Sequence, residues 1–410
     1  MEKITYRVEE LGAVVGGGTP STQTTEYWDG DIPWISPADL TGYTNVYISR
    51  GAKNITEEGL KKSSTKLLPK GTVLLSSRAP IGYLAIAQND ICTNQGFKSI
   101  ICNEDVVNNK YLYYFLKLNV EHLKAFASGA TFPELSGNSL KRIKLYIAKD
   151  VNIQRRIADI LANYDELVEA NNKRIAILEQ MAENLYKEWF VRFRFPGHET
   201  AEFEKGLPKG WEYVRFGKAI EIIDGDRGKN YPTQEEFYEQ GECLFLNAGN
   251  VTKRGFDFSS CAYITKEKDH LLRKGKLQTN DVVLTTRGTV GNVAFLNDAM
   301  TFSPMRINSG MVILRNLGVV SPEYIYTALR HEILQKTMAM YASGSAQPQL
   351  PIKDMRRIKI INPDDATMRK FSKITSEIYQ QISLLIMKNQ TLTKQRDLLL
   401  PRLMSGKLEV

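Results

Sequence analysis

The sequence predicts an α+β protein in which one mainly β or mixed domain occurs twice, with the copies separated by a long antiparallel two-helix coiled coil. Three observations predict this class. The chain has 410 residues, more than one ordinary core needs. Two phrases recur in the same order about 210 residues later, and two long segments place apolar residues at alternating spacings of three and four. Copies at opposite ends of an antiparallel helix pair would be related by a pseudo-two-fold axis.

Two repeated phrases indicate the duplication. GTVLLSSRAPIG at residues 71–82 aligns without gaps with NDVVLTTRGTVG at residues 280–291, an offset of 209. SGATFPELSGNSLKRIKL at residues 128–145 aligns with SGSAQPQLPIKDMRRIKI at residues 343–360, an offset of 215. The order is kept, and the period far exceeds the roughly 20 to 50 residues of solenoid repeats, so the repeat is a whole domain.

Each copy has the same order of local patterns. Short β-branched or alternating runs, separated by Gly, Pro, Asn and Asp, predict strands, and one helix is expected to follow them. The expected strands include residues 71–77, 83–88 and 97–102 in the first copy and residues 281–286, 292–297 and 310–316 in the second. The expected helices are residues 108–127 and 321–342.

A long helical run follows each copy, at residues 151–193 and 363–410. The first run has a narrow seam formed by Ile157, Leu161, Tyr164, Val168, Asn171, Ile175, Leu178, Ala182, Leu185 and Trp189. The second seam is formed by Ile378, Ile382, Leu385, Asn389, Leu392, Leu399 and Leu403. A seam of this kind is unstable on a lone helix in water, so we expect the two helices to pair with each other.

Two asparagines, Asn171 and Asn389, interrupt the seams near the middle of the helices. A buried polar residue in a coiled coil can fix the register of pairing at some cost in stability. The alternative is that both side chains are simply hydrated where the packing is loose.

About 40 helical residues would make a rod of roughly 60 Å. A two-fold protein of this kind suits DNA with two half-sites separated by whole helical turns of about 34 Å.

Composition and charge narrow the class of protein. The net charge of +8 suits a polyanionic partner, and residues 151–193, with six basic and seven acidic residues, are the only segment without a basic excess. No export signal or membrane anchor is expected. The four cysteines lack any CxxC pair and the four histidines are isolated, which indicates reduced thiols in a cytoplasm and no metal site.

Catalytic motifs are absent from the sequence. The nearest approach to a nucleotide-binding GxxxxGK[ST] loop, GDRGKN at residues 225–230, lacks both its spacing and its hydroxyl. Neither a methyl-donor pocket nor a base-flipping loop is recognisable, and HExxH, GxSxG and kinase signatures are missing. We therefore expect no catalytic residue and no cofactor.

A glycine-rich phrase, GGGTPST at residues 16–22, is a candidate for contact with a DNA backbone. Its glycines could expose backbone N–H groups, and Thr19, Ser21 and Thr22 supply hydroxyls. The alternative is a glycine-rich turn with a structural role. The second copy has IDGDRGKNYPT at residues 223–233 in its place.

Six phrases in order carry a resemblance that covers essentially the whole chain. They are YRVEELGAVVGGGTPSTQTTEYWDGDIPWISPADL (6–40), LSSRAPIG (75–82), SGATFPEL (128–135), LEQMAENLYKEWF (178–190), GLPKGWEYV (206–214) and TKQRDLLLPRLMSGKLEV (393–410). Together they closely resemble the specificity subunit of type I restriction-modification enzymes.

The resemblance implies a non-catalytic, cytoplasmic subunit that reads a split DNA target. Residues 1–150 and 204–362 would be target recognition domains, one for each half-site. Residues 151–193 and 363–410 would be helical spacers that set the distance between half-sites. The implied partners are double-stranded DNA, two modification (methyltransferase) subunits, and restriction subunits that act as ATP-dependent translocases and nucleases.

Candidate DNA contacts follow from the repeat. Arg78 and Arg287 can form hydrogen bonds to phosphate or guanine. Their recurrence in both copies, however, favours a salt bridge within each domain. Residues that read different bases should differ between copies, so Thr131, Phe132 and Glu134 against Ala346, Gln347 and Gln349 are the better specificity candidates. Asn247 and Asn250, which correspond to the loop at residues 34–43, are candidates on the same ground. For all of them the alternative is turn chemistry.

Two other functions stay open at this point. A self-contained restriction or methylation enzyme is disfavoured by the missing cofactor motifs. A coiled-coil scaffold without a DNA role would explain the helices but not the matched domains.

Overall fold

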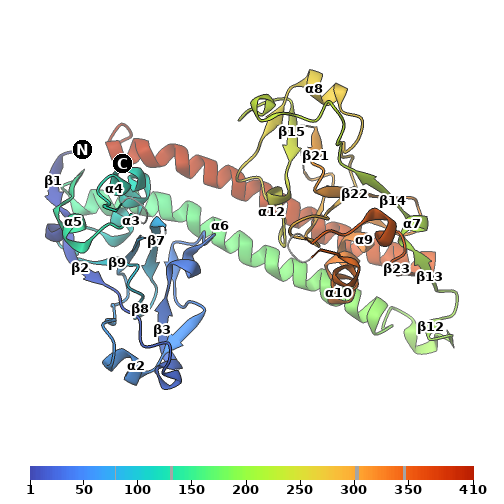
Figure 1. The fold of residues 1–410 in the computed structure, drawn as a ribbon, viewed down its shortest axis with the longest axis horizontal. Coiled ribbons are helices and arrows are strands. Elements are labelled where there is room, and N and C mark those ends of the chain that lie inside the picture. Colours follow the sequence, from blue (N-terminus) through green and yellow to red (C-terminus); the bar gives the residue numbers. More distant parts are fainter. Residues whose placement is uncertain (79, 130–132, 301–303, 345–347) are drawn as a thin grey trace. The chain divides into compact units, whose positions relative to one another are not determined.

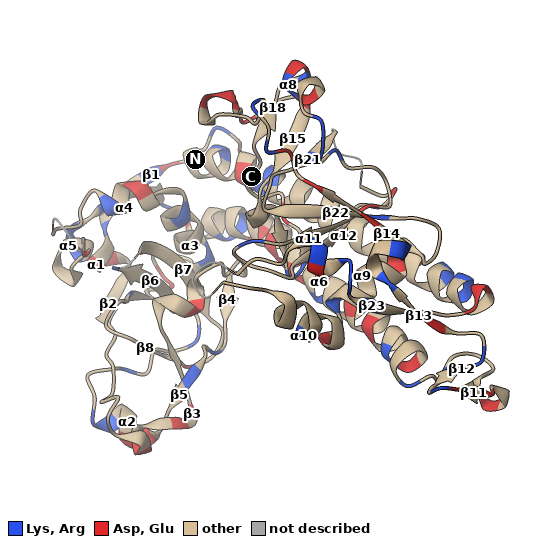
Figure 2. Ribbon diagram, turned by 45° about the vertical axis from the view of Figure 1, so that its right-hand side comes forward, with Lys and Arg blue, Asp and Glu red and all other residues tan. Residues whose placement is uncertain are grey.

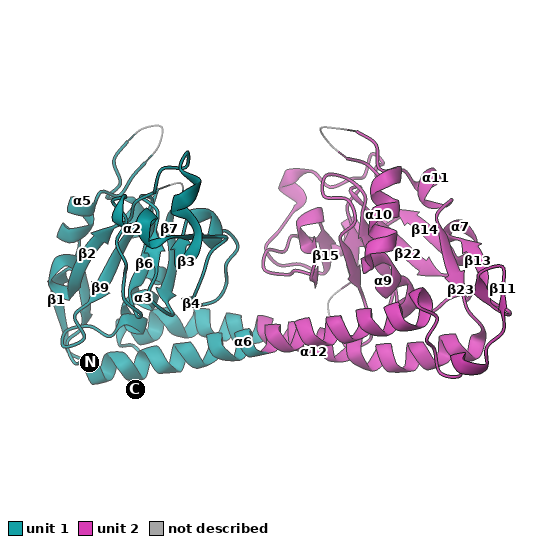
Figure 3. Ribbon diagram, turned by 90° about the horizontal axis from the view of Figure 1, so that it is seen from below, with its two compact units in different colours: residues 1–170, 391–410 teal, residues 171–390 magenta. Residues whose placement is uncertain are grey.

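The computed structural model describes residues 1–78, 80–129, 133–300, 304–344 and 348–410. These residues form two compact units, which Figure 3 colours separately. Unit 1 comprises Met1–Ala170 and Thr391–Val410, and unit 2 comprises Asn171–Gln390. Both units combine strands and helices (Figure 1), which confirms the predicted mixed class.

The described strands of unit 1 form three sheets. They are β1 (Lys3–Arg7), β2 (Gly12–Gly16), β3 (Trp28–Ile35), β4 (Tyr47–Ile48), β5 (Lys53–Ile55), β6 (Val73–Ser77), β7 (Ile81–Ala87), β8 (Cys92–Thr93), β9 (Lys98–Cys102) and β10 (Lys144–Ala148). One sheet has the order β2-β9-β6-β7-β4, the second has the order β5-β3-β8, and β1 pairs with β10. The β4–β7 and β3–β8 pairs are parallel.

Short helices complete the core of unit 1. They are α1 (Val8–Leu11), α2 (Glu57–Lys61), α3 (Asn109–Leu118), α4 (Val120–Lys124) and α5 (Gly137–Arg142), with 3₁₀ turns η1 (Thr25–Tyr27) and η2 (Pro37–Leu40). The Asn108 side chain caps α3 by accepting from the Tyr111 N–H. Helix α3 buries Tyr111 and Tyr114 in the same cluster as Val73 and Ile100 of the central sheet.

Unit 2 repeats this arrangement. Its strands are β11 (Phe203–Glu204), β12 (Leu207–Pro208), β13 (Glu212–Arg215), β14 (Ile220–Asp224), β15 (Cys243–Leu246), β16 (Val251–Thr252), β17 (Gly255–Phe256), β18 (Tyr263–Ile264), β19 (Val282–Thr285), β20 (Val293–Phe295), β21 (Met305–Ile307), β22 (Met311–Asn316) and β23 (Lys359–Asn362). The larger sheets have the orders β14-β22-β19-β20 and β18-β15-β21, and β13 pairs with β23. Two hairpins, β11–β12 and β16–β17, have no counterpart among the described strands of unit 1.

The helices of unit 2 are α7 (Phe216–Ala219), α8 (Lys266–Leu271), α9 (Pro322–Arg330), α10 (Glu332–Tyr341) and α11 (Ile352–Met355). Its short turns are η4 (His198–Thr200), η5 (Gln234–Glu236) and η6 (Ala248–Asn250). Helix α9 is buried on all sides from Glu323 to Leu329 and packs in a cluster that contains Tyr324, Leu314 and Phe371.

The strand registers confirm the internal duplication. Val73 pairs with Ile100 in unit 1, and its counterpart Val282 pairs with Leu314 in unit 2. The β2-β9-β6-β7 order of unit 1 equals the β14-β22-β19-β20 order of unit 2. The two copies therefore share strand order and register, as well as repeated phrases.

Two expected helices are each broken in the structure. Residues 108–127 form α3 and α4, with a non-helical residue, Asn119, between them, and its side chain donates to the Phe115 carbonyl. Residues 321–342 form α9 and α10, separated at His331, which is extended. The apolar period continues across both breaks, which is why the sequence predicted a single helix in each copy.

Two long helices take part in both units. Helix α6 (Val151–Tyr186) continues into a π-helical turn, η3 (Lys187–Val191), and α12 spans Asp365–Ser405. No helix of the described chain is long and apolar enough to cross a membrane.

Within each unit the predicted seams lie on the buried face. In unit 1, Ile157 and Leu161 share a core with Leu400 and Leu403. In unit 2, a second core contains seam residues of both helices, namely Ile175, Leu178, Ala182, Ile378, Ile382 and Leu385. There Asn171 contacts Asn389, and Arg174 contacts Gln381. Rising numbers on α6 meet falling numbers on α12, so the helices of unit 2 pack antiparallel.

Candidate nucleic-acid interface

The first hydroxyl of each repeated phrase holds a turn. Ser76 Oγ donates to the Pro80 carbonyl at 2.7 Å and accepts from the Tyr83 N–H at 2.8 Å. Thr285 Oγ1 makes the same two bonds in unit 2, with residues at the same offset of 209. Ser76 and Thr285 are fully buried. The phrase therefore recurs because a buried hydroxyl fixes the turn that follows the strand.

The second hydroxyl joins this turn to a neighbouring loop. Ser77 Oγ donates to the Gly96 carbonyl at 3.1 Å, and Thr286 Oγ1 donates to the Gly310 carbonyl at 3.1 Å. Both glycines end an Asn-X-Gly turn, at residues 94–96 and 308–310, in which the asparagine side chain accepts from the glycine N–H. This recurring triplet is a signal in the sequence that the predicted site residues did not include, with NQG and NSG at matched positions.

The second repeated phrase forms a loop that is fastened beside the same turn. A pair of backbone hydrogen bonds closes the loop, and a further backbone bond ties it to the strand that carries the hydroxyls. The residues are Ser128 with Glu134 and Leu135 with Ser77 in unit 1, and Ser343 with Gln349 and Leu350 with Thr286 in unit 2. Four candidates in this loop, Thr131, Phe132, Ala346 and Gln347, lie outside the described residues.

The structure brings Arg78 and Glu134 together. Arg78 Nη1 lies 3.7 Å from Glu134 Oε2, and Lys98 Nζ lies 3.6 Å from the other oxygen of the same carboxylate. This ion pair is the structural alternative raised for Arg78. Arg287, its counterpart, has no ion pair among the described residues, and its Nε is buried without a hydrogen-bond partner there. The counterpart of Glu134 is the exposed Gln349.

The glycine-rich phrase has a structural role in its first half. The Gly17 N–H donates to the Phe97 carbonyl at 3.3 Å and the Gly18 N–H donates to the Thr93 carbonyl at 2.9 Å, so neither can cradle a phosphate. A Cβ on Gly17 would lie 1.9 Å from the Asn94 oxygen. In unit 2, a Cβ on Gly225 would lie 2.1 Å from the oxygen of the matched asparagine. Both glycines are required because two backbones approach closely.

The hydroxyls of this phrase lie at the surface. Thr19 Oγ1 is hydrogen-bonded to the Gln95 side chain, and Thr19 is half-buried. Ser21 and Thr22 are exposed. The Ser21 backbone carbonyl accepts a hydrogen bond from the Trp28 indole at 3.0 Å. The Ser21 hydroxyl takes no part in this bond.

Asn247 and Asn250 stand in different environments. Each takes part in a cap of η6, in which Asn250 Oδ1 accepts from the Asn247 N–H at 2.9 Å. Asn250 is buried, and its Nδ2 donates to the carbonyls of Asp257 and Ser260 at 2.9 and 2.8 Å. Asn247 is exposed, and only its Oδ1 is occupied in the described structure, by the Gly249 N–H. Ser36 and Asp39 make the matching cap in unit 1.

A hollow of about 210 Å³ lies beside Gln349 in unit 2. Its lining includes Arg227 and Lys353, and Arg227 forms an ion pair with Asp224 at 2.9 Å. In unit 1 the strand position that corresponds to Val312, a further lining residue, is Lys98. Basic and acidic residues are interspersed over both units rather than separated (Figure 2).

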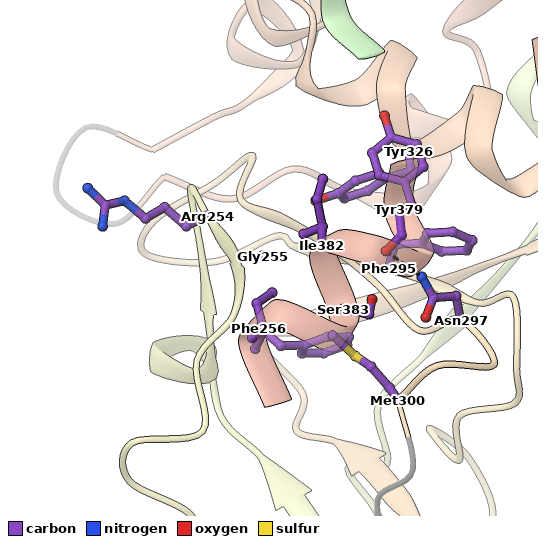
Figure 4. Close-up of a pocket in the computed structure, with 11 residues that line it drawn as sticks. Arg254, Gly255, Phe256, Phe295, Asn297, Met300, Tyr326, Tyr379, Ile382 and Ser383 are labelled. Atoms are coloured by element: carbon purple, nitrogen blue, oxygen red, sulfur yellow. Dashed lines mark hydrogen bonds between the residues drawn. The ribbon is translucent and has the colours of Figure 1, made fainter. Parts of the chain in front are cut away.

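A second, apolar crevice in unit 2 lies against α12 (Figure 4). Phe256 of the β16–β17 hairpin, Phe295 of β20 and Ile382 of α12 are among the residues that line it. Its free volume is about 10 Å³, which accommodates little more than one water molecule. This crevice is a packing defect and not a binding pocket.

Neither a cluster of metal-ligating side chains nor an activated thiol occurs among the described residues. No group of three or more His, Cys, Asp or Glu side chains could hold a metal ion there. Burial raises the pKa of the Cys102 and Cys243 thiols to about 12, and that of Cys92 to about 11. Thiols with such pKa values are poor nucleophiles at neutral pH.

Sequence comparison identifies relatives of both halves. A family model described as the type I restriction modification DNA specificity domain matches residues 2–180 and again residues 208–394. The chain is 36% identical over 412 residues to the type I restriction enzyme MjaIX specificity subunit of Methanocaldococcus jannaschii, covering 98% of this chain and 93% of that protein. It is 24% identical over 446 residues to the HindI specificity subunit of Haemophilus influenzae, covering 92% and 94% of the two chains.

The fold also has a relative among solved structures. The crystal structure of the type I restriction-modification system S subunit from M. genitalium aligns with a TM-score of 0.61 and 17% identity, covering 98% of this chain and 96% of that chain. At this identity the likeness concerns the fold. The family model matches both halves, and the M. jannaschii relative aligns over almost the full length. The chain therefore belongs to the type I restriction modification DNA specificity domain family.

Proposed function

We propose that this protein is the DNA sequence-specificity subunit of a type I restriction-modification complex, and that each domain reads one half of a split target. The observation that carries the proposal is one scaffold of loop and turn that recurs in both units with different side chains. Glu134 in unit 1 and Gln349 in unit 2 occupy the matched position. A carboxylate accepts from cytosine, whereas an amide pairs with adenine, so the same scaffold can serve two different half-sites.

The proposed DNA-facing residues follow from their exposure and their remaining hydrogen-bonding capacity. Arg78 and Asn250 are assigned to local structure, since their polar groups have partners within their own unit. Thr131, Phe132, Ala346 and Gln347 lie outside the described residues and stay candidates because they differ between the two copies. The other candidates for contact are Thr19, Ser21, Thr22, Glu134, Asn247, Arg287 and Gln349.

We further propose that α6 and α12 form one antiparallel coiled coil that spaces the domains about a pseudo-two-fold axis. Residues 1–150 and 204–362 would be the recognition domains, and residues 151–193 and 363–410 the spacers. The 2.7 Å bond from Asn171 to Asn389 supports their role in fixing the register. Asn389 also donates to the neighbouring Asn172 at 2.9 Å, so the polar position is hydrogen-bonded on both sides.

The proposed partners are double-stranded DNA, two modification subunits that dock on the spacers, and restriction subunits. The subunit itself would be non-catalytic and would act in the cytoplasm. The names of the relatives, which are specificity subunits of type I restriction enzymes, support this assignment.

Mapping of methylated adenines in whole genomes tests the proposal. Cells that express the chain with its modification subunit should methylate one split sequence that cells without the chain leave unmodified. Changing Gln349 to Ala should alter the bases recognised in one half of that sequence only. Identical methylation with and without the chain would refute the proposed function.

The two alternative functions predict other outcomes. A self-contained enzyme would transfer labelled methyl groups from the donor to DNA without any partner, which the purified chain should not do. A scaffold without a DNA role would leave the methylated sequence unchanged when the recognition domains are altered.

A further inference from the structure

The two units differ in the side chain that stands opposite the arginine of the repeated phrase. The strand registers match Arg78 with Arg287, and the isolated bridges match their partners Glu134 and Gln349. In each unit the arginine backbone pairs with the residue at this loop position. The side chains, however, are an acid in one unit and an amide in the other.

In unit 1 the arginine is held by its own domain. The Glu134 carboxylate lies within 3.7 Å of Arg78 and 3.6 Å of Lys98, so both cations share one acceptor. At 3.7 Å, between side chains that are each 39% exposed, this contact is an ion pair that partly neutralises Arg78, and not a hydrogen bond. This arrangement gives Arg78 an ion-pair partner within its own domain.

Among the described residues of unit 2, the arginine has no such acceptor. Gln349 carries no charge, and no ion pair of Arg287 occurs among the described residues. Its Nε is buried without a hydrogen-bond partner in that part of the chain, although a guanidinium offers five donors and buried donors are normally satisfied. Arg287 as a whole is half-buried, so an acceptor from outside the protein would meet the outer nitrogens of its guanidinium and not the enclosed Nε.

The surroundings of Arg287 can admit a ligand. The hollow of about 210 Å³ is lined by Gln349 and by Thr286, which directly precedes Arg287. Its wall carries two cations, Arg227 and Lys353, together with the Asp224 carboxylate. Val312 of β22 occupies the position that Lys98 occupies in β9 of unit 1. Unit 2 therefore lacks a lysine at the strand position from which Lys98 pairs with Glu134 in unit 1.

We propose that Arg287 contacts DNA directly, whereas Arg78 does not. The inference rests on the proposed function and adds an asymmetry to it. The ligand of Arg287 is a pair of DNA acceptor atoms, which can be two phosphate oxygens or the O6 and N7 atoms of guanine. Both match the planar fork of a guanidinium.

Salt-dependent binding separates the two sources. The probe is a duplex that carries the sequence mapped by methylation, bound by the complex of the full chain with its modification subunits. If Arg287 grips phosphate, Arg287→Gln should lower the slope of log K against log salt by about 0.9 and weaken all sequences alike. If it reads guanine, the slope should stay and discrimination against one base substitution should fall about tenfold or more.

Matched variants serve as controls. Arg78→Gln should leave both the slope and the discrimination as in the wild type. Gln349→Glu should give Arg287 the partner that Arg78 already has, and should reproduce the loss seen in Arg287→Gln while keeping the arginine. Thermal unfolding and assembly with the modification subunits show whether each variant is folded.

The outcomes that overturn the inference are distinct from failure of the proposed function. Wild-type complex that binds the duplex, together with an Arg287→Gln complex of unchanged affinity, slope and discrimination, would refute the contact. Equal losses in Arg78→Gln and Arg287→Gln would refute the asymmetry. A wild-type complex that ignores the duplex would instead contradict the proposed function itself.

Discussion

Arg306 and Asp269 form a buried ion pair that ties helix α8 to strand β21 in unit 2. Their side chains are each 6% exposed, and Arg306 Nε donates to Asp269 Oδ1 at 2.5 Å. Other guanidinium nitrogens donate to the carbonyls of Lys274 and Leu272. Burial alone would raise the pKa of Asp269, but hydrogen bonds from Lys276 and Arg306 outweigh it and lower this pKa below 3.8. The carboxylate is therefore ionised because its donors are in place.

Replacing Asp269 with Asn should destabilise unit 2 by about 3 kcal/mol, because Arg306 would remain buried without its countercharge. Hydrogen exchange measured over β15 and β21 should report the loss. Asp298→Asn, at an exposed site, is the control and should change little. Exchange rates that are equal in both variants would contradict the role assigned to this pair.

The same pair makes unit 2 sensitive to acid. A lowered folded-state pKa contributes stability that is complete above the unfolded value near 3.8 and is lost as the pH falls through the folded value. The wild type should therefore lose unfolding free energy below about pH 4 more steeply than Asp269→Asn. Urea unfolding at pH 7 and pH 3 measures the difference, and parallel pH profiles would contradict it.

The cysteines should react slowly in the native protein. Burial raises the pKa of Cys102 and Cys243 to about 12 from 9.0, so about a thousandfold less thiolate is present at pH 8. Alkylation by iodoacetamide, followed by mass spectrometry, should label these two thiols far more slowly than the same residues in urea. Rapid labelling of the folded chain would show that they are accessible and ionised.

At the scale of elements, polar contacts attach the long helices to the domain in unit 1. Asp165 of α6 accepts from the Tyr114 hydroxyl of α3 at 2.5 Å and forms a buried ion pair with Arg396 of α12. In unit 2 the matching place on α12 is taken by Tyr379, whose hydroxyl is hydrogen-bonded to Thr327 of α9 at 2.5 Å. In both units a tyrosine hydroxyl thus takes part in a contact between the domain and a long helix, but with different chemistry.

Removing the Asp165 carboxylate should be costly. Asp165→Ala should lower the stability of unit 1 by about 3 kcal/mol, since Arg396 would lose its buried partner. Asp159→Ala is the matched control on the same helix, because Asp159 is 64% exposed and its pair with Lys110 should contribute less than about 1 kcal/mol. Hydrogen exchange over α3 should separate the two variants. Similar exchange in both would mean that the buried pair adds no stability.

At the scale of the whole molecule, the two units have separate cores. The buried cluster of unit 1 draws on both long helices through Leu161 and Leu403, and that of unit 2 does so through Leu178 and Ile382. Each domain thus packs on its own section of the helices. A change of side chains in one recognition loop need not disturb the other domain.

Exchange of one domain tests this independence, and it rests on the proposed function. Replacing residues 204–362 with the corresponding segment of a relative should change one half of the methylated sequence and keep the other half. Sequencing of modified adenines in the host genome measures the outcome. A change in both halves would show that the domains do not read DNA independently.

The sequence alone determined the duplication, most of the main strands and the two helical seams. These features depend on local period and composition, which repeat visibly at offsets of 209 and 215. It missed the breaks at Asn119 and His331, where the apolar period continues although the backbone does not.

Only the tertiary structure decided which candidate residues are occupied by their own domain. The Asn250 amide donates to carbonyls up to ten residues away in the sequence. Asp165 forms an ion pair with Arg396, which is 231 residues away in the sequence. Arg78 and Arg287 stand at matched positions of a repeated phrase, yet one has a carboxylate partner and the other has none in the described chain. Partners of this kind are set by which segments the fold brings together, and no local pattern encodes that distance.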